Sequence, residues 1–175
     1  NSEVSRWLAL RQPRTLSPEL TALLKRCDHW RQLSHGAFHP GVEAFTRAWK
    51  AGEQRGEAPS GIELDRLVES LRPGAWSWTA EGPQATGLPI TVNALAKGTI
   101  LDAVASAVLR VKGVTGVAVV IGGDLVVQGD LTRPAVIASP QSALTGVSDL
   151  DVVRVHRQGL ATSSGKYRGV TIDGV

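Results

Sequence analysis

The sequence predicts an α+β fold, in which a mainly helical N-terminal part precedes a largely antiparallel sheet with packed helices. Two periods support this prediction. Up to Pro73 the apolar residues recur every three or four positions, as on one face of a helix. After Gly74 they alternate with polar residues, as in half-buried strands. The 175 residues are long enough for one substantial core, so we expect a single domain over residues 1–175.

Three helices are expected before Pro73. The first begins at the Ser-Pro-Glu sequence of residues 17–19, which combines an N-cap with a first-turn proline and an acid. The second covers residues 42–51, and residues 52–61 form a polar, glycine-rich loop. The third follows Ser60, which has an acid three positions later in capping-box spacing.

The part after Gly74 is expected to place strands around one long helix. This helix spans about residues 96–112, with one face formed by Ile100, Val104, Ala107, Val108 and Val111. A β-branched run at residues 117–121 predicts a central strand that turns back into a second strand at residues 125–127. Further strands are expected at residues 76–78, 90–92, 135–138, 152–155, 160–163 and 170–172.

Charge, apolar run length and cysteine content limit the kinds of partner and environment that we expect for this protein. Lys and Arg number 19 against 16 Asp and Glu, and the small excess is spread out, so we expect no nucleic acid or anionic membrane as partner. The longest apolar runs fall short of the ~20 residues that cross a bilayer. Cys27 is the single cysteine and cannot form an internal disulfide. Since the chain opens at Asn1, we expect a mature or trimmed product.

The segment around Lys97 is the strongest candidate for binding an anion. A predicted strand leads into a helix N-terminus, where free N–H groups and the helix dipole favour negative charge. Lys97 adds a full positive charge, and Gly98 lets a ligand approach the backbone. Phosphate binding is the functional interpretation. The alternative is a solvated lysine in the first turn of a helix.

Two further segments carry polar groups at turns. The Gly122-Gly123-Asp124 sequence can make room for a ligand and offer it a carboxylate, although it is also an ordinary hairpin turn. The hydroxyls of residues 162–164 can bond to a polar ligand or simply form a turn. A phosphate loop of the NTPase type is excluded there, because Leu160 and Tyr167 stand where that loop needs Gly and Ser or Thr.

Other chemistries find less support. His35 and His39 are four residues apart, but Gly36 and Pro40 argue against a shared helical face, so no zinc site is expected. No base near the serines in sequence supports a Ser-His-Asp hydrolase. The five tryptophans are expected mostly to pack in the core.

Five ordered segments together resemble the ApbE family of FAD:protein FMN transferases. SEVSR at residues 2–6 is similar to that family's S-E-L-S-R, and SHGAFHP at residues 34–40 with a later Trp to its S-x-G-A-F-D-P…W. ALAKG at residues 94–98 with Asp102 resembles G-I-A-K-G-x-x-x-D. VIGGD at residues 120–124 resembles N-x-G-G-D, and LATSSGKY at residues 160–167 resembles A-T-S-G-x-Y. These matches cover nearly the whole chain.

The resemblance implies an ApbE-like, T-fold-related domain and an enzyme of the cell envelope. Such an enzyme binds FAD with Mg²⁺, transfers FMN to a threonine of an acceptor flavoprotein and releases AMP. A lipid anchor outside this chain would attach it to the membrane. The alternatives are a non-catalytic FAD-binding module, a magnesium-dependent FAD pyrophosphatase, and an interaction domain without flavin.

The resemblance also assigns the site residues. Backbone carbonyls at Ala94 and Ala96 would join the Mg²⁺ shell, since carbonyl oxygens suit this hard cation. The residues that would hold FAD are Lys97, Gly98, Asp102, Gly122, Gly123, Asp124, Thr162 and Ser163. The catalytic base is not identified.

The chain departs from the family pattern in several places. His39 stands where the family usually has aspartate, and Thr91 and Asn93 stand in place of aspartate and glycine. The family's later H-x-x-D-P-x-T-G segment, its downstream Asp…Thr metal ligands and its strand before Ser2 have no counterpart. We therefore expect either a fragment of a longer protein or a degenerate member that lacks most metal ligands.

Overall fold

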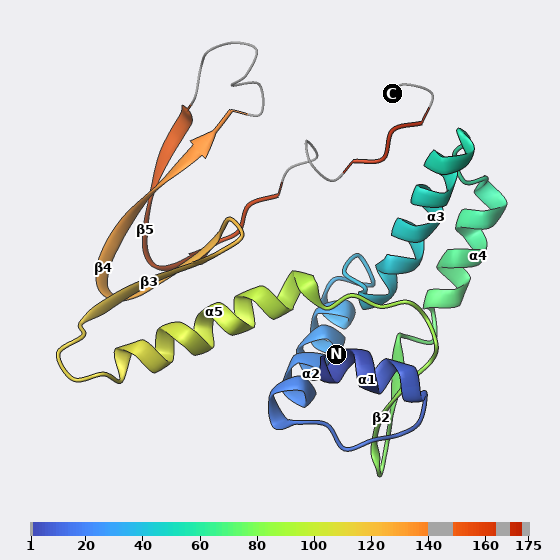
Figure 1. Ribbon diagram of the computed structural model, residues 1–175, viewed down its shortest axis with the longest axis horizontal. Coiled ribbons are helices and arrows are strands. Elements are labelled where there is room, and N and C mark those ends of the chain that lie inside the picture. Colours follow the sequence, from blue (N-terminus) through green and yellow to red (C-terminus); the bar gives the residue numbers. More distant parts are fainter. Residues whose placement is uncertain (1, 140–148, 164–168, 173–175) are drawn as a thin grey trace. The chain divides into compact units, whose positions relative to one another are not determined.

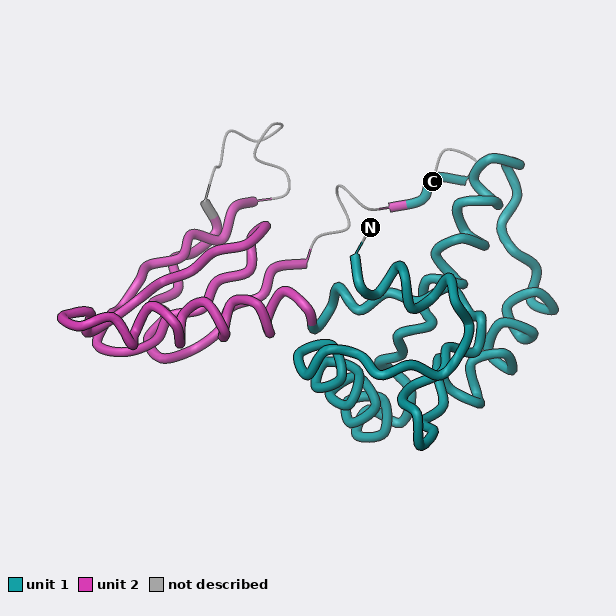
Figure 2. The backbone as a smooth tube through the Cα atoms, turned by 60° about the horizontal axis from the view of Figure 1, so that its bottom comes forward, with its two compact units in different colours: residues 1–95, 170–175 teal, residues 96–169 magenta. Residues whose placement is uncertain are grey.

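The computed structural model describes residues 2–139, 149–163 and 169–172, and the chain divides into two compact units (Figure 2). The first unit comprises Asn1–Leu95 and Val170–Val175, and the second Ala96–Gly169. The described residues contain both helices and antiparallel strand pairs, which confirms the predicted α+β class. The assignment of one domain stays a prediction. Within the same described ranges, no helix is both long and apolar enough to cross a bilayer.

The first unit is mainly helical, as predicted (Figure 1). Its helices are α1 (Glu3–Leu10), α2 (Pro18–Leu33), α3 (Glu43–Arg55) and α4 (Gly61–Leu71). The 3-10 turn η1 (Pro40–Val42) precedes α3, and the paired strands β1 (Trp76–Thr79) and β2 (Gly82–Ala85) follow α4. Helices α2 and α4 begin where their caps predict, because the side chains of Ser17 and Ser60 accept backbone N–H bonds. Neither α1 nor β2 is among the predicted elements.

Helix α3 corrects the predicted helix end at Gly52 and the loop from residue 52. The helix continues to Arg55 and ends at Gly56, which has a left-handed φ of 73°. Gly52 is buried within the helix, and a Cβ there would lie 2.6 Å from the carbonyl oxygen of Glu57. Close approach of the following chain therefore explains this glycine, rather than helix termination.

The core of the first unit centres on Trp7, whose exposed fraction is 1%. Its indole Nε1 donates to the carbonyl of Pro83 at 2.9 Å, and its ring meets that of Trp76 edge to face at 6.1 Å between centroids. The prediction that the tryptophans mostly pack in the core is wrong beyond this pair. The other three are exposed by between 38% and 46%: Trp30, Trp49 and Trp78.

Three predicted strands are wrong, and in two of them a backbone N–H is bonded outside any sheet. In residues 90–92, the N–H of Thr91 donates to the carbonyl of Pro40 at 2.8 Å. In residues 170–172, the N–H of Thr171 donates to the carboxylate of Glu53 at 2.9 Å. A donor satisfied in this way needs no strand partner. Of residues 160–163, only the first belongs to a strand.

The second unit combines helix α5 (Asn93–Leu109, its first three residues counted with the first unit) with a three-stranded sheet. The strands β3 (Gly116–Ile121), β4 (Asp124–Ala138) and β5 (Asp149–Leu160) pair in the order β3-β4-β5. Ile121 pairs with Asp124, so the predicted hairpin with its two-glycine turn is confirmed. The prediction that residues 117–121 form a central strand is wrong for the described sheet, because β3 lies at its edge and β4 in its middle. The predicted strands at residues 125–127 and 135–138 are two parts of β4, and the strand at 152–155 lies within β5.

Helix α5 packs on the sheet through a different face from the one predicted. It begins three residues before the expected start and ends three residues before the expected end. Its buried residues are Leu101 and Ala105, which cluster with Val126 and the half-buried apolar residues of β3. Ile100 and Val104 of the predicted stripe are exposed. Apolar side chains occupy most sides of this helix, so the spacing could not single out one face.

Candidate functional site

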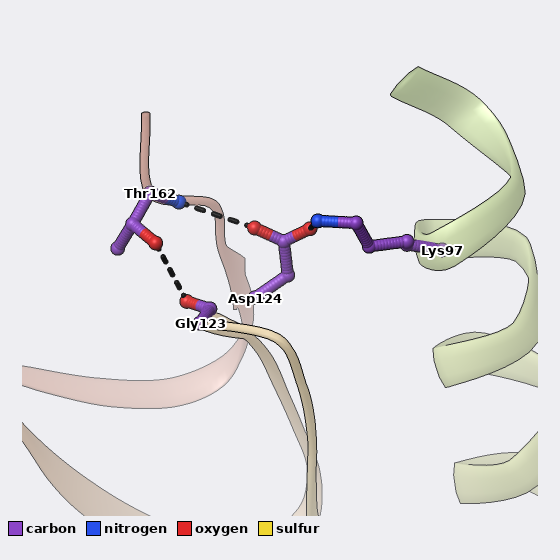
Figure 3. A network of polar contacts seen from close by, with 4 residues as sticks. All are labelled: Lys97, Gly123, Asp124 and Thr162. Carbon is purple, nitrogen blue, oxygen red and sulfur yellow. Dashed lines mark hydrogen bonds and ion pairs between the residues drawn. The ribbon is translucent and has the colours of Figure 1, made fainter. Parts of the chain in front are cut away.

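Side chains from three distant segments meet in the second unit (Figure 3). The ammonium group of Lys97, on α5, donates to a carboxylate oxygen of Asp124 at 2.9 Å. The other oxygen of Asp124 accepts the backbone N–H of Thr162 at 3.2 Å. The hydroxyl of Thr162 donates to the carbonyl of Gly123 at 3.0 Å. We call these four residues the Lys97 network.

Lys97 does not lie in the first turn of its helix, as the sequence analysis expected. Helix α5 begins at Asn93, so the free N–H groups of its first turn precede Lys97 by one turn. The residues before the helix do not form the expected strand. The position of the lysine ammonium is instead set by Asp124, with which it forms the ion pair.

The β3–β4 turn fixes the position of Asp124. Gly122 and Gly123 have φ values of 55° and 91°, which a two-residue hairpin turn requires and which glycine adopts without strain. A Cβ on Gly123 would lie 2.6 Å from the hydroxyl oxygen of Thr162, so the segment after β5 lies directly against this turn. Thr162 therefore locks the turn and the carboxylate together.

Space beside Lys97 is kept open by two glycines. A Cβ on Gly98 would meet nothing within 4 Å among the described atoms, and one on Gly122 would meet only the Lys97 ammonium, at 3.9 Å. The Lys97 side chain is 32% exposed and that of Asp124 is 18% exposed. A ligand can thus reach the ammonium group from solvent.

The positive charge of Lys97 is already balanced by the carboxylate of Asp124, so Lys97 attracts an anion less strongly than an unpaired lysine would. An ammonium group has three N–H donors, and the carboxylate takes one of them. A phosphate group can therefore bind Lys97 while Asp124 holds the ammonium in position. The arrangement suits a diphosphate that shares the lysine more than an anion that displaces the aspartate.

Four other predicted site residues are not members of the Lys97 network: Asp102, Ser163, Ala94 and Ala96. The Asp102 side chain is exposed on α5 and accepts a bond from Gln128 of β4 at 3.4 Å. Ser163 is exposed after β5, and the remaining residues of its motif, 164–167, lie outside the described residues. Ala94 and Ala96 lie in the first turn of α5.

A metal site is not assembled by the described residues. Within the ranges that the structure describes, no group of three or more His, Cys, Asp or Glu side chains could hold a metal ion. The carbonyls of Ala94 and Ala96 are inside α5, where helical carbonyls point along the axis toward N–H groups four residues on. These residues alone do not fit a magnesium site, so we derive no step through the metal.

His39 takes over a role that an aspartate can perform. Its Nδ1 accepts the N–H of Gly41 at 2.9 Å and thereby caps η1, as a carboxylate would. Its Nε2 lies 3.1 Å from the carbonyl of Leu71, which a neutral imidazole protonated at Nε2 satisfies. Burial lowers the pKa of His39, and the nearby Arg31 lowers it further.

One feature of the first unit is missing from the sequence analysis: a cavity of about 690 Å³ beside His39. Arg31, Phe45 and Val68 line it from three different helices. No local motif joins these residues, so only the tertiary packing reveals the cavity.

Comparison with known proteins connects this geometry to a family. The sequence profile of the ApbE family matches residues 1–175. No curated protein matches the sequence. Among solved structures, the ApbE protein from Thermotoga maritima is similar over 99% of this chain, with 20% identity and a TM-score of 0.79.

Two flavin transferase structures are also similar. The apo flavinyl transferase ApbE of Pseudomonas stutzeri matches 93% of this chain with 24% identity and a TM-score of 0.67. The flavin transferase ApbE of Vibrio cholerae matches 94% with 18% identity and a TM-score of 0.68. The chain covers 58%, 52% and 57% of the three proteins, so it spans little more than half their length. These similarities confirm the expected ApbE-like fold.

Proposed function

The chain belongs to the ApbE family, and we propose that it forms the FAD-holding part of a flavin transferase. In the proposed reaction, magnesium-dependent FAD:protein FMN transfer, the FMN half of FAD passes to a threonine of an acceptor flavoprotein, with release of AMP. The proposed location is the cell envelope, with a lipid anchor outside this chain. Two relatives of similar fold are described as flavin transferases, which supports the reaction class.

The proposed step is a substitution at phosphorus. A bond forms between the threonine hydroxyl oxygen and the phosphorus of the FMN half, and the bond from that phosphorus to the bridging oxygen breaks. AMP leaves with that oxygen, and the threonine proton passes to a base. We assign no catalytic residue, because no described side chain is placed against a reacting atom.

One observation carries the proposal: three of the five matched segments meet in the Lys97 network. Lys97, Asp124 and Thr162 are 27 and 38 residues apart along the chain, yet hydrogen bonds of 2.9 Å and 3.2 Å join them. Such convergence beside open space is typical of a binding site. In the proposed complex Lys97 binds the diphosphate of FAD, Asp124 orients the ammonium, and Gly98 and Gly122 admit the ligand.

The decisive experiment mixes the full-length protein with FAD, Mg²⁺ and an acceptor protein that carries a D-G-x-T-type threonine site. We expect a fluorescent flavoprotein band that survives denaturation, together with one AMP per transferred FMN. Omitting Mg²⁺ should abolish the band. AMP and free FMN without acceptor would instead indicate a pyrophosphatase, and FAD binding without AMP release would indicate a non-catalytic module.

Lys97→Ala tests the role assigned to the network. Loss of a charge-assisted bond should weaken FAD binding by about tenfold or more, as measured by fluorescence titration. Lys112→Ala is the matched control, since it removes an exposed lysine elsewhere in the second unit. Equal affinity of Lys97→Ala and wild type would contradict the proposed diphosphate contact.

A further inference from the structure

The segment that leads into α5 is tied to the turn η1 through Thr91. From residue 87 to residue 92 the chain has no regular secondary structure. Within this segment, the backbone N–H of Thr91 donates to the carbonyl of Pro40 at 2.8 Å. Both residues belong to the first unit, as do the first three residues of α5. The bond therefore connects the approach to the helix with a distant part of the chain.

The turn η1 offers Thr91 a fixed acceptor. Pro40 is fully buried, and Gly41 is buried beside it. A Cβ on Gly41 would lie 2.5 Å from Cδ2 of Leu71 and 3.0 Å from Nδ1 of His39, so the turn packs closely against the end of α4. His39 also caps the turn through the N–H of Gly41. Since close packing and a cap hold η1, the carbonyl of Pro40 has little freedom to move.

The side chain of Thr91 acts on the first residue of α5. Its hydroxyl oxygen accepts the backbone N–H of Asn93 at 3.3 Å. The first N–H groups of a helix have no partner within the helix and need one from outside. Val92 directly precedes the helix and has no side-chain acceptor, so the hydroxyl of Thr91 serves in its place. The carbonyl of Val92 accepts the N–H of Leu95 at 3.1 Å, which completes the first turn.

We propose that Thr91 is a positioning residue, which joins η1 to the first turn of α5 and thereby fixes where the helix that carries Lys97 begins. Lys97 lies one turn after Asn93, so opening of the first turn removes the helical support on its N-terminal side. Thr91 touches no ligand and acts only through the helix. Its effect on FAD rests on the proposed function, whereas its effect on the helix start does not.

Hydrogen exchange of single amides, measured by NMR on the full chain, tests the positioning role without any ligand. Thr91→Val keeps the shape of the side chain and removes the acceptor. We expect the first-turn amide of Leu95 to exchange about fivefold faster in this variant, and the amide of the buried Leu101 to keep its rate. Thr91→Ser restores the hydroxyl and should return Leu95 to within about twofold of wild type. Thr46→Val, which removes an exposed hydroxyl from α3, is the matched control.

Fluorescence titration of the same variants with FAD tests the consequence for Lys97. Thr91→Val should weaken FAD binding about fivefold, and Thr91→Ser and Thr46→Val should stay within about twofold of wild type. His39→Ala leaves Thr91 in place but removes the cap of η1, and it should also accelerate exchange at Leu95.

The outcomes separate the positioning role from the proposed function. Unchanged exchange at Leu95 in Thr91→Val, or equal acceleration in Thr46→Val, would overturn the positioning role. Faster exchange with unchanged FAD affinity would overturn its link to Lys97. Failure of the wild-type protein to bind FAD would contradict the proposed function, and the exchange rates alone would then decide whether Thr91 fixes the start of α5.

Discussion

Lys97 in the second unit and Arg31 in the first are both cations beside open space, but their surroundings differ. Lys97 is held by Asp124 in a network that a turn and Thr162 lock, whereas the Nε of Arg31 is buried without a partner among the described residues. A ligand at Lys97 must share the ammonium group with Asp124. The comparison indicates that substitution of the half-exposed Lys97 side chain should change ligand affinity more than stability, and that the packed interior of the first unit should show the reverse.

The largest effect is expected in that interior. Trp7→Ala removes a fully buried ring together with its bond to Pro83, and should lower the free energy of unfolding by about 3–5 kcal/mol in urea titration. Trp78→Ala is the matched control, because this tryptophan is 42% exposed. A similar loss in the two variants would break the distinction between buried and exposed tryptophans. If Trp7→Ala fails to fold, Trp7→Phe keeps most of the packing and isolates the lost bond.

An intermediate effect is expected at the turn of the Lys97 network. Gly123→Ala forces a side chain into a φ of 91° and against the hydroxyl of Thr162, and should cost about 1–3 kcal/mol of unfolding free energy. Adding Thr162→Ala removes the clash but not the backbone strain, so the double variant should be more stable than the sum of the single losses predicts. Strict additivity would show that Thr162 does not lie against the turn.

Gly98→Ala should separate stability from affinity, because the two are expected to change in opposite directions. Gly98 lies inside α5 with open space around it, so alanine should stabilise the helix by up to about 1 kcal/mol. If FAD approaches the backbone there, the same change should weaken FAD binding several-fold. Gain of stability without loss of affinity would place the ligand elsewhere.

Elements with a local chemical signal could be predicted from the sequence. The caps at Ser17 and Ser60 and the two-glycine turn before Asp124 each depend on neighbouring residues, and the structure has them in place. The wrong strand at residues 90–92 shows the limit, because alternation is also compatible with an extended segment whose N–H bonds a distant carbonyl. Gly52 shows it again, since only tertiary packing distinguishes a tightly packed helical glycine from a C-cap.

The candidate site divides in the same way. Residue type and motif identify Lys97 and Asp124, but neither the ion pair between them nor the bond of Asp102 to Gln128 follows from spacing. Likewise, the cavity at Arg31 is built from helices whose individual patterns show no gap. The ion pair, the bond of Asp102 and the cavity all arise from contacts between segments that are distant in the sequence. Hydrophobic periodicity within one segment does not predict such contacts.

The smallest expected effect is a pH dependence at His39, where one proton is linked to folding. Its pKa is lowered in the folded state by burial and by Arg31, and a protonated Nδ1 could no longer accept the N–H of Gly41. As pH falls through about 6.5, the unfolded chain takes up this proton first, so the free energy of unfolding decreases until the folded histidine also titrates.

His39→Asn keeps a capping acceptor but cannot titrate. Its unfolding free energy should therefore fall less steeply than that of wild type below pH 6.5, while the difference between the two proteins stays constant above pH 7.5. Parallel curves over the whole pH range would contradict this prediction, because they would mean that burial and Arg31 do not keep the folded imidazole neutral.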